Sequence, residues 1–256
     1  MRSIVRSFLL VTIAASAMCA LAATPVAGQQ IATVRDPRPV AAMVLQLETS
    51  HSWRITYEDP PYANDADIDD VTDQVVRDAS ERSWLKVLVP KTRTLSVPRL
   101  AGVTDESKAL RTVVIQYNAM VGYEAFQIVQ DGPVFHVIPK NMKDGSGQLQ
   151  AAMAVLDTKI AIGAGERSIF QLIDEICAKI SVASGTPVKI GTVPQSLLRN
   201  LKTPVSTAGR KQSARAILDE VFSRSGVHLS WRLLFDPKDR FYALNLHEVP
   251  ARPAEK

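Results

Sequence analysis

Six aspartates lie between residues 59 and 73, and their spacing raises the question of a calcium site. Asp65, Asp67 and Asp69 have the i, i+2, i+4 spacing with which an EF-hand loop begins. That loop requires glycine at its sixth position and glutamate at its twelfth, where this chain has Asp70 and Val76. The EF-hand pattern therefore fails. A solvated acidic loop is the favoured interpretation, and a looser calcium loop stays open.

A pair of glycines raises a second possibility, a dinucleotide site. Gly163 and Gly165 lie between a strand-like run and a helix-like run, where a dinucleotide-binding fingerprint is found. Ser168 stands in place of the third glycine. Glu166 would put a negative charge near the pyrophosphate, which the start of a helix should instead attract. The segment therefore predicts a strand-to-helix turn and no cofactor site.

Hydrolytic and metal-dependent chemistry lacks its usual signatures. The sequence has neither a G-x-S-x-G elbow nor an H-E-x-x-H helix. The acidic pairs Asp174-Glu175 and Asp219-Glu220 are neighbours on expected helices, where residues i and i+1 do not face each other, so both pairs are predicted to be solvated. We assign no catalytic, cofactor-binding or metal-binding residue. Four histidines without a partner at metal-ligand spacing are interpreted as scattered polar surface residues: His51, His136, His228 and His247.

The N-terminal residues predict export. Arg2 and Arg6 give a positive start, an almost wholly apolar run follows, and Ala20-Leu21-Ala22 has the small-x-small cleavage pattern. We expect a signal peptide over residues 1–22, with a second cleavage point after Gly28. The apolar run is shorter than the roughly 20 residues of a membrane span. The expectation is a periplasmic or secreted bacterial protein without stable membrane insertion.

Cysteine content and charge exclude two further classes. Cys19 lies in the expected signal peptide, which leaves Cys177 without a partner for an internal disulfide. Because Cys177 falls in a strongly apolar helical segment, it is interpreted as a packing residue. The net charge of +4 comes from 30 basic and 26 acidic residues. This balance argues against nucleic-acid binding, which needs a clustered basic face.

The chain repeats itself. The helix-type spacing of apolar residues from Val40 to Leu47 recurs 129 positions later, from Ile169 to Ile176. A second helical segment, from Val113 to Gly122, recurs 104 positions later, from Ile217 to Gly226. Both segments lead into short strand-like runs. Self-similarity of this kind indicates one architectural unit used twice.

The two offsets also locate an insertion. Their difference places about 25 extra residues in the first copy, and the Asp-rich stretch from Asp59 to about Trp84 fits. Each copy reads helix–strand–strand–helix–strand–strand, with a leading strand clear only in the second copy. Residues 85–89 and 92–97 look like strands that could pair as a hairpin. Residues 141–148 are rich in Lys, Gly and Ser and form the expected linker.

Aromatic residues gather near the strand ends of both copies. Most are expected in the core, and any left exposed beside Pro60-Pro61 would form a partner-binding patch. In the first copy they are Trp53, Tyr57 and Tyr62, and in the second they are Trp231, Phe235 and Tyr242.

The second copy resembles a known family. Lys159 to Ile162 reads as a strand, Ile169 to Ile180 as a helix ending near Gly185, and Ala214 to Gly226 as a second helix running into a hairpin. This order resembles the short N-terminal (STN) module found ahead of secretins and of signal-transducing TonB-dependent receptors. The first copy is similar but looser. The resemblance implies a periplasmic protein-interaction module of mixed α+β fold, without enzymatic activity, and it brings no functional residue with it.

These observations predict an α+β protein of two tandem STN-like modules, over residues 31–140 and 155–249. Each would pack two helices against short two- to three-stranded sheets. The favoured function is non-enzymatic binding of a cell-envelope protein through exposed strand edges or the Asp-rich loop. The alternative is a secreted hydrolase with a site between the modules. A continuous sheet around a charged pocket would favour the alternative.

Overall fold

The computed structural model describes residues 31–76, 86–98, 104–195, 197, 204–207 and 211–250. The expected signal peptide, its two cleavage points and Cys19 lie outside these residues, as does the end of the insertion at Trp84. Within the described ranges, no helix has the length and apolar character needed to cross a membrane. The expected α+β class is confirmed, because helices and short strands alternate through both modules.

Module 1 (residues 31–140) contains a leading strand that its sequence pattern did not reveal. β1 pairs antiparallel with β5 along its whole length. The helix ends follow their sequence signals: Asp105 caps α4 by accepting from the Lys108 amide, and Gly122 ends α4 at φ 81°. The main elements are β1 (Ile31–Asp36), α1 (Pro39–His51), β2 (Ile55–Glu58), β5 (Arg93–Pro98), α4 (Glu106–Val121), β6 (Phe126–Asp131) and β7 (Val134–Pro139).

Module 2 (residues 155–249) follows the same plan. Its first helix is fixed by a capping box, in which the side chains of Ser168 and Gln171 each accept from the other residue's backbone amide. The elements are β10 (Lys159–Ala161), β11 (Gly165–Ser168), α5 (Ile169–Ser184), β12 (Val188–Ile190), β13 (Pro204–Thr207), β14 (Lys211–Ser213), α7 (Ala214–Arg224), β15 (Leu229–Asp236) and β16 (Phe241–Glu248).

The insertion and the linker carry short elements of their own. The predicted hairpin of residues 85–89 with 92–97 is wrong, because β4 pairs with β3 whereas β5 pairs with β1. The physical reason is that β5 delivers Leu95 and Val97 to the core under α1 and α4. The insertion contains η1 (Asp65–Asp67), β3 (Ile68–Asp70), α2 (Thr72–Val75) and β4 (Leu88–Pro90), and the linker region contains β8 (Asn141–Lys143), β9 (Leu149–Ala151) and η2 (Val155–Asp157).

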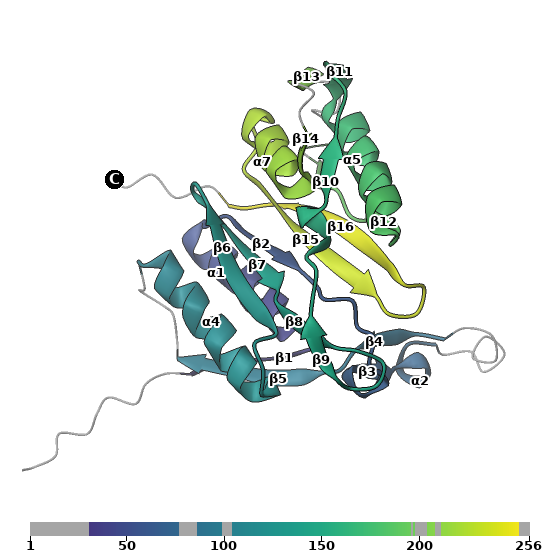
Figure 1. The fold of residues 1–256 in the computed structure, drawn as a ribbon. Helices are drawn as coiled ribbons and strands as arrows, with labels where there is room; N and C mark the ends of the chain where they lie inside the picture. Colours follow the sequence, from purple (N-terminus) through teal and green to yellow (C-terminus); the bar gives the residue numbers. More distant parts are fainter. Residues whose placement is uncertain are drawn as a thin grey trace, which may run out of the picture. The chain divides into compact units, whose positions relative to one another are not determined.

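Both modules order their strands in the same way. The strand after the first helix runs parallel to the second strand of the closing hairpin, which gives β2-β7-β6 in module 1 and β12-β16-β15 in module 2. These two three-stranded parts join edge to edge, because β2 also runs parallel to β15. One six-stranded sheet results, in the order β12-β16-β15-β2-β7-β6 (Figure 1). The pattern within one module cannot reveal this junction, which depends on its neighbour.

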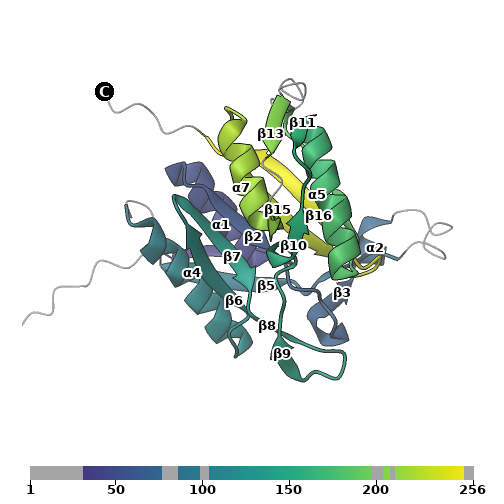
Figure 2. The same cartoon turned by 45° about the horizontal axis from the view of Figure 1, so that its top comes forward.

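The two helix pairs cover opposite faces of this sheet. Directly paired residues of parallel strands share a face, and Tyr57 pairs with Arg232 while Glu58 pairs with Leu233. Tyr57 belongs to the core under α1 and α4, whereas Leu233 belongs to the core under α5 and α7. Since successive residues of a strand point to opposite faces, the two cores lie on the two sides of the sheet (Figures 1 and 2).

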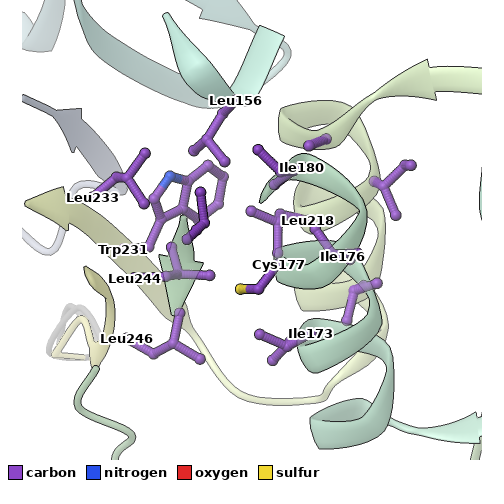
Figure 3. Close-up of a cluster of buried hydrophobic side chains, with 14 of the residues drawn as sticks. Leu156, Ile173, Ile176, Cys177, Ile180, Leu218, Trp231, Leu233, Leu244 and Leu246 are labelled. Carbon is purple, nitrogen blue, oxygen red and sulfur yellow. The ribbon is translucent and has the colours of Figure 1, made fainter. Parts of the chain in front are cut away.

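Trp231 lies at the centre of the core of module 2. It is fully buried and packs its ring against Phe222, with centroids 5.5 Å apart. Figure 3 shows it among aliphatic side chains that include Ile180 of α5, Leu244 of the sheet and Leu156 of η2. Cys177 belongs to the same cluster, and burial raises the pKa of its thiol to about 12. The interpretation of Cys177 as a packing residue is confirmed.

We predict that Trp231→Ala lowers the free energy of unfolding by about 3–5 kcal/mol, because it leaves a cavity that the core cannot refill. Urea denaturation followed by circular dichroism measures this loss. The matched control is Val182→Ala on α5, at a side chain that is 87% exposed. The control should change stability by less than about 0.5 kcal/mol. Equal denaturation midpoints for the two variants would contradict the proposed core.

Candidate functional site

Three aspartates of the insertion, Asp67, Asp69 and Asp70, already bind groups of the same chain. Asp67 accepts from Arg93 at 2.8 Å, Asp69 accepts from the Thr92 amide at 2.9 Å, and Asp70 caps the turn that follows it. Asp59 is fully buried and is not part of a solvated loop. Among the described residues, no group of three or more His, Cys, Asp or Glu side chains could hold a metal ion.

Several sequence candidates occupy places other than those expected. Asp219 is largely buried between the modules, so its assignment to a solvated helix face is wrong. His136 is fully buried, and His247 bonds to a buried carboxylate, so these two are not scattered surface histidines. Gly163 lies between β10 and β11, whereas Gly165 begins β11, so the predicted strand-to-helix turn is wrong in part: a short strand directly precedes α5. The aromatic residues are mostly core, because Tyr57, Trp231, Phe235 and Tyr242 are buried.

The junction of β2 with β15 concentrates buried charge. Glu58 accepts from Arg215 Nη2 at 2.8 Å, and Arg215 Nε also donates to Asp157 at 3.0 Å. The second carboxylate oxygen of Glu58 accepts from the Leu156 amide at 3.3 Å. Burial raises the pKa of Glu58, and the Arg215 guanidinium offsets part of that rise. One carboxylate therefore ties β2 to α7 and to η2.

Asp59, the next residue, makes a second set of bonds. One oxygen accepts from Arg38 Nε at 2.6 Å and from the Phe235 amide at 2.9 Å. The other accepts from the hydroxyls of Tyr57 at 2.8 Å and Tyr62 at 3.2 Å. The carboxylate therefore joins the start of α1 to β15. The signal available in the sequence was a pair of acidic residues directly after an apolar strand.

A third buried carboxylate, Glu48 of α1, reaches β15 and β16. It accepts from Arg232 at 3.3 Å and lies 2.8 Å from Nε2 of His247, while its other oxygen accepts from the Ile55 amide at 3.3 Å. Burial raises the pKa of nearby Glu106 to about 7, and the negative charge of Glu48 adds to the effect. The first helix of module 1 is thus bonded to the sheet of module 2.

The junction also holds a chain of groups that resembles a catalytic triad. Thr56 Oγ1 lies 2.7 Å from His136 Nδ1, and Nε2 of this histidine lies 3.4 Å from Asp219 Oδ2. Burial, with the charges of Arg215 and Arg54, lowers the pKa of His136 to about 3. Burial raises the pKa of Asp219 to about 6. With its pKa lowered this far, the imidazole of His136 is a weak general base for the Thr56 hydroxyl.

Access rules against nucleophilic chemistry at this chain of groups. Thr56 and His136 are both 0% exposed. An open groove of about 320 Å³ lies between β4 and the β15–β16 hairpin, but none of the three groups lines it. The two charged residues of that groove are engaged: Arg38 binds Asp59, and Asp236 accepts from the amides of the hairpin turn. A second hollow, beside Tyr62 and Tyr117, measures about 30 Å³ and could hold about one water molecule.

The two ends of the sheet differ in how they are protected. At β12, the Ser181 hydroxyl accepts from the Val188 amide at 2.7 Å and donates to the Cys177 carbonyl of its own helix at 2.7 Å. At β6, the Asn118 side chain bonds both backbone groups of Phe126, at 3.1 and 3.0 Å. Beyond Val188, one residue of β12, Ile190, has backbone groups that face outward. Beyond Phe126, two residues of β6 have them, Ile128 and Gln130.

In the described part of the chain, β6 pairs with β7 alone, so the edge formed by residues 128–130 is open. The β6–β7 hairpin closes on the pair Asp131 and Val134, so residues 127, 129 and 131 bond to β7 and the backbone groups of Ile128 and Gln130 point outward. Val129 is 41% exposed. The strand carries no lysine or proline, the usual guards of an exposed edge. The edge can therefore accept a further strand.

Comparison of the chain with protein-family models, with curated proteins and with solved structures found no match. The resemblance to the STN module stays a prediction.

We predict that Glu58→Gln lowers the free energy of unfolding by about 3 kcal/mol, because it leaves the Arg215 charge buried with a weakened partner. The double variant Glu58→Leu with Arg215→Met should be more stable than Glu58→Gln, since both buried charges are removed. Urea denaturation measures all three. Glu124→Gln, which breaks an exposed pair with Lys140, is the control and should cost less than about 0.5 kcal/mol. A Glu58→Gln loss as small as that of the control would contradict the assignment.

Acidification should change the contributions of His136 and Asp219 to folding stability in opposite directions. The folded pKa of His136, about 3, lies below its ordinary value of 6.5, so its contribution to stability is lost as the pH falls from about 6.5 to 3. The folded pKa of Asp219, about 6, lies above its ordinary value of 3.8, so its contribution rises as the pH falls through that window. Between about pH 4 and pH 6 the two effects oppose each other.

We therefore predict opposite pH slopes for two variants. Relative to the wild type, Asp219→Asn should lose stability on acidification from pH 6 to pH 4, by up to about 1.4 kcal/mol per pH unit. His136→Gln should gain stability relative to the wild type over the same range. Urea midpoints at several pH values measure both slopes, and the wild type corrects for all other groups. Parallel curves for the three proteins would show that these residues do not titrate as described.

Proposed function

We propose that this protein is an exported, non-enzymatic component of the bacterial envelope that binds another protein by strand addition to β6. The observation that carries the proposal is the open edge at Ile128 and Gln130. Strand addition gives affinity through backbone hydrogen bonds, and the side chains beside the edge give selectivity. The export signal expected at residues 1–22 supports a periplasmic or secreted location.

The flank of α4 beside β6 supports the same surface. Asn118 of α4 bonds to Phe126 at the start of β6, so this flank of the helix borders the edge. Ile115, one turn earlier on that flank, is 63% exposed. An apolar side chain next to unpaired backbone groups is a combination that a bound strand would cover. The Asp-rich insertion is the weaker candidate, because three of its aspartates are bound within the chain.

The hydrolase alternative has one observation in its favour, the Thr56–His136–Asp219 chain at the module junction. A nucleophile must reach its substrate, and Thr56 is fully buried away from both hollows described above. The charged groups of the junction also bond to one another across the two modules. This arrangement supports a structural role for the junction, and binding at β6 as the function.

Photo-crosslinking in the native envelope tests the proposal. A photoreactive residue at Val129 should form an adduct with another protein, and Ile128→Pro should abolish that adduct by removing an outward-facing N–H. The matched control places the same photoreactive residue at Val182, an exposed valine of α5. Circular dichroism of Ile128→Pro should match that of the wild type, which checks that the variant remains folded. The same adduct from both positions, or an adduct indifferent to Ile128→Pro, would contradict binding at β6.

A further inference from the structure

The repeat shows how a strand docks on this type of edge, because one of the two equivalent edges is already filled. Within the chain, β15 of module 2 receives β2 of module 1. β6 holds the corresponding place in module 1, as the first strand of its hairpin and the neighbour of the second helix. The β2–β15 junction is therefore an internal example of the docking proposed for β6.

Contacts fix which residues correspond. The 104-position repeat matches Asn118 to Phe222, and these residues contact Phe126 and Trp231 respectively. Phe126 therefore corresponds to Trp231, and Ile128 to Leu233. The match agrees with burial, because Ile128 packs under the helices of its own module just as Leu233 does. It also agrees with direction, since the Leu233 carbonyl accepts from Asp59 of the docked strand.

Side chains of the helix beside each edge determine which strand can bind there. By the same repeat, Arg111 of α4 corresponds to Arg215 of α7, the partner of Glu58. Arg215 is buried by the docked strand and linker, whereas Arg111 is exposed and its Nε bonds to the Ser107 hydroxyl at 3.1 Å. In the described part of the chain, no carboxylate pairs with Arg111. Its guanidinium is placed to receive an acidic residue of an incoming strand.

The second selective position differs between the two edges. Asp219 of α7 pairs with Arg54, which directly precedes β2 and lies four residues before Glu58. The corresponding residue of α4 is Ile115, which is exposed and apolar. An incoming strand that satisfied both positions would therefore carry an apolar residue at the position of Arg54 and an acidic residue at the position of Glu58.

We infer that β6 and α4 bind an extended segment of another protein, parallel to β6, with an apolar residue four positions before an acidic one. This inference rests on the proposed function and adds the chemistry of the partner. The free β12 edge of a second copy of this chain does not meet the requirement for an acidic residue. The registers of the β2–β7 and β12–β16 pairs place Gly191, the residue after β12, at the position of Glu58. The β12 edge therefore has no carboxylate at that position.

A peptide derived from the filled junction tests the inference. The probe copies Ser52 to Asp59 with Arg54→Leu, carries a fluorophore, and is titrated with the full chain while anisotropy is recorded. We expect binding that weakens about 10-fold when the peptide carries Glu58→Gln or the protein carries Arg111→Glu. Lys108→Glu on α4 is the matched charge control and should change binding less than about 2-fold.

A charge swap makes the assignment specific. The peptide with Glu58→Lys should bind Arg111→Glu protein more tightly than wild-type protein, because the pair is restored with reversed signs. No binding at about 1 mM peptide, or binding indifferent to Arg111, would overturn the inference. If the Val129 adduct formed in cells despite either of these peptide results, strand addition to β6 would still be supported. Only the proposed sequence of the partner strand would then be wrong. Concentration-dependent self-association through β6 would also overturn it.

Discussion

Two adjacent buried carboxylates, Glu58 and Asp59, hold the two modules together as one structure. Glu58 reaches Arg215 of α7, while Asp59 reaches Arg38 at the start of α1 and the Phe235 amide of β15. The β2–β15 ladder itself pairs only two residues of each strand. So short a parallel contact fixes its register weakly. The buried charges find their partners in only one register of β2 against β15. They therefore fix the register that the few backbone hydrogen bonds leave weakly defined.

The opposite placement of the helix pairs explains why the junction is polar. Each module leaves one face of its three strands without its own helices, and the neighbouring module supplies the cover. Residues Arg215 and Asp219 of α7 lie over β2 and β7, and Glu48 of α1 reaches β15 and β16. A buried charge is costly unless it is paired. Thr56 and His136 are paired residues of the β2–β7 ladder, and the cover that α7 provides adds Asp219, so the triad-like alignment follows from sheet pairing and module packing.

Local signals predicted the elements well, and the arrangement between modules poorly. The residues that cap and end helices, such as Asp105 and Gly122, act through their nearest neighbours and are readable from the sequence. The leading strand β1 alternates weakly and pairs with a strand about 60 residues away, so its own pattern did not identify it. Asp219 was assigned to solvent because its helix was considered alone. Its burial depends on strands of the other module, which a pattern confined to one helix does not contain.

The two free edges of the sheet differ, and comparison of equivalent positions in the two modules shows how. In a tandem array each unit covers one edge of the next, and the terminal units need protection. At the β12 end, Ser181 accepts from the Val188 amide, and Gly191 stands where β2 has the carboxylate of Glu58. A Cβ at Gly191 would lie 2.4 Å from Oδ1 of Asn245, so a larger residue there would have to displace the Asn245 side chain. The β6 end keeps an arginine at the position of Arg215 and leaves its backbone unpaired. Because of this difference between the two ends, we propose that the partner strand binds at β6 and not at β12.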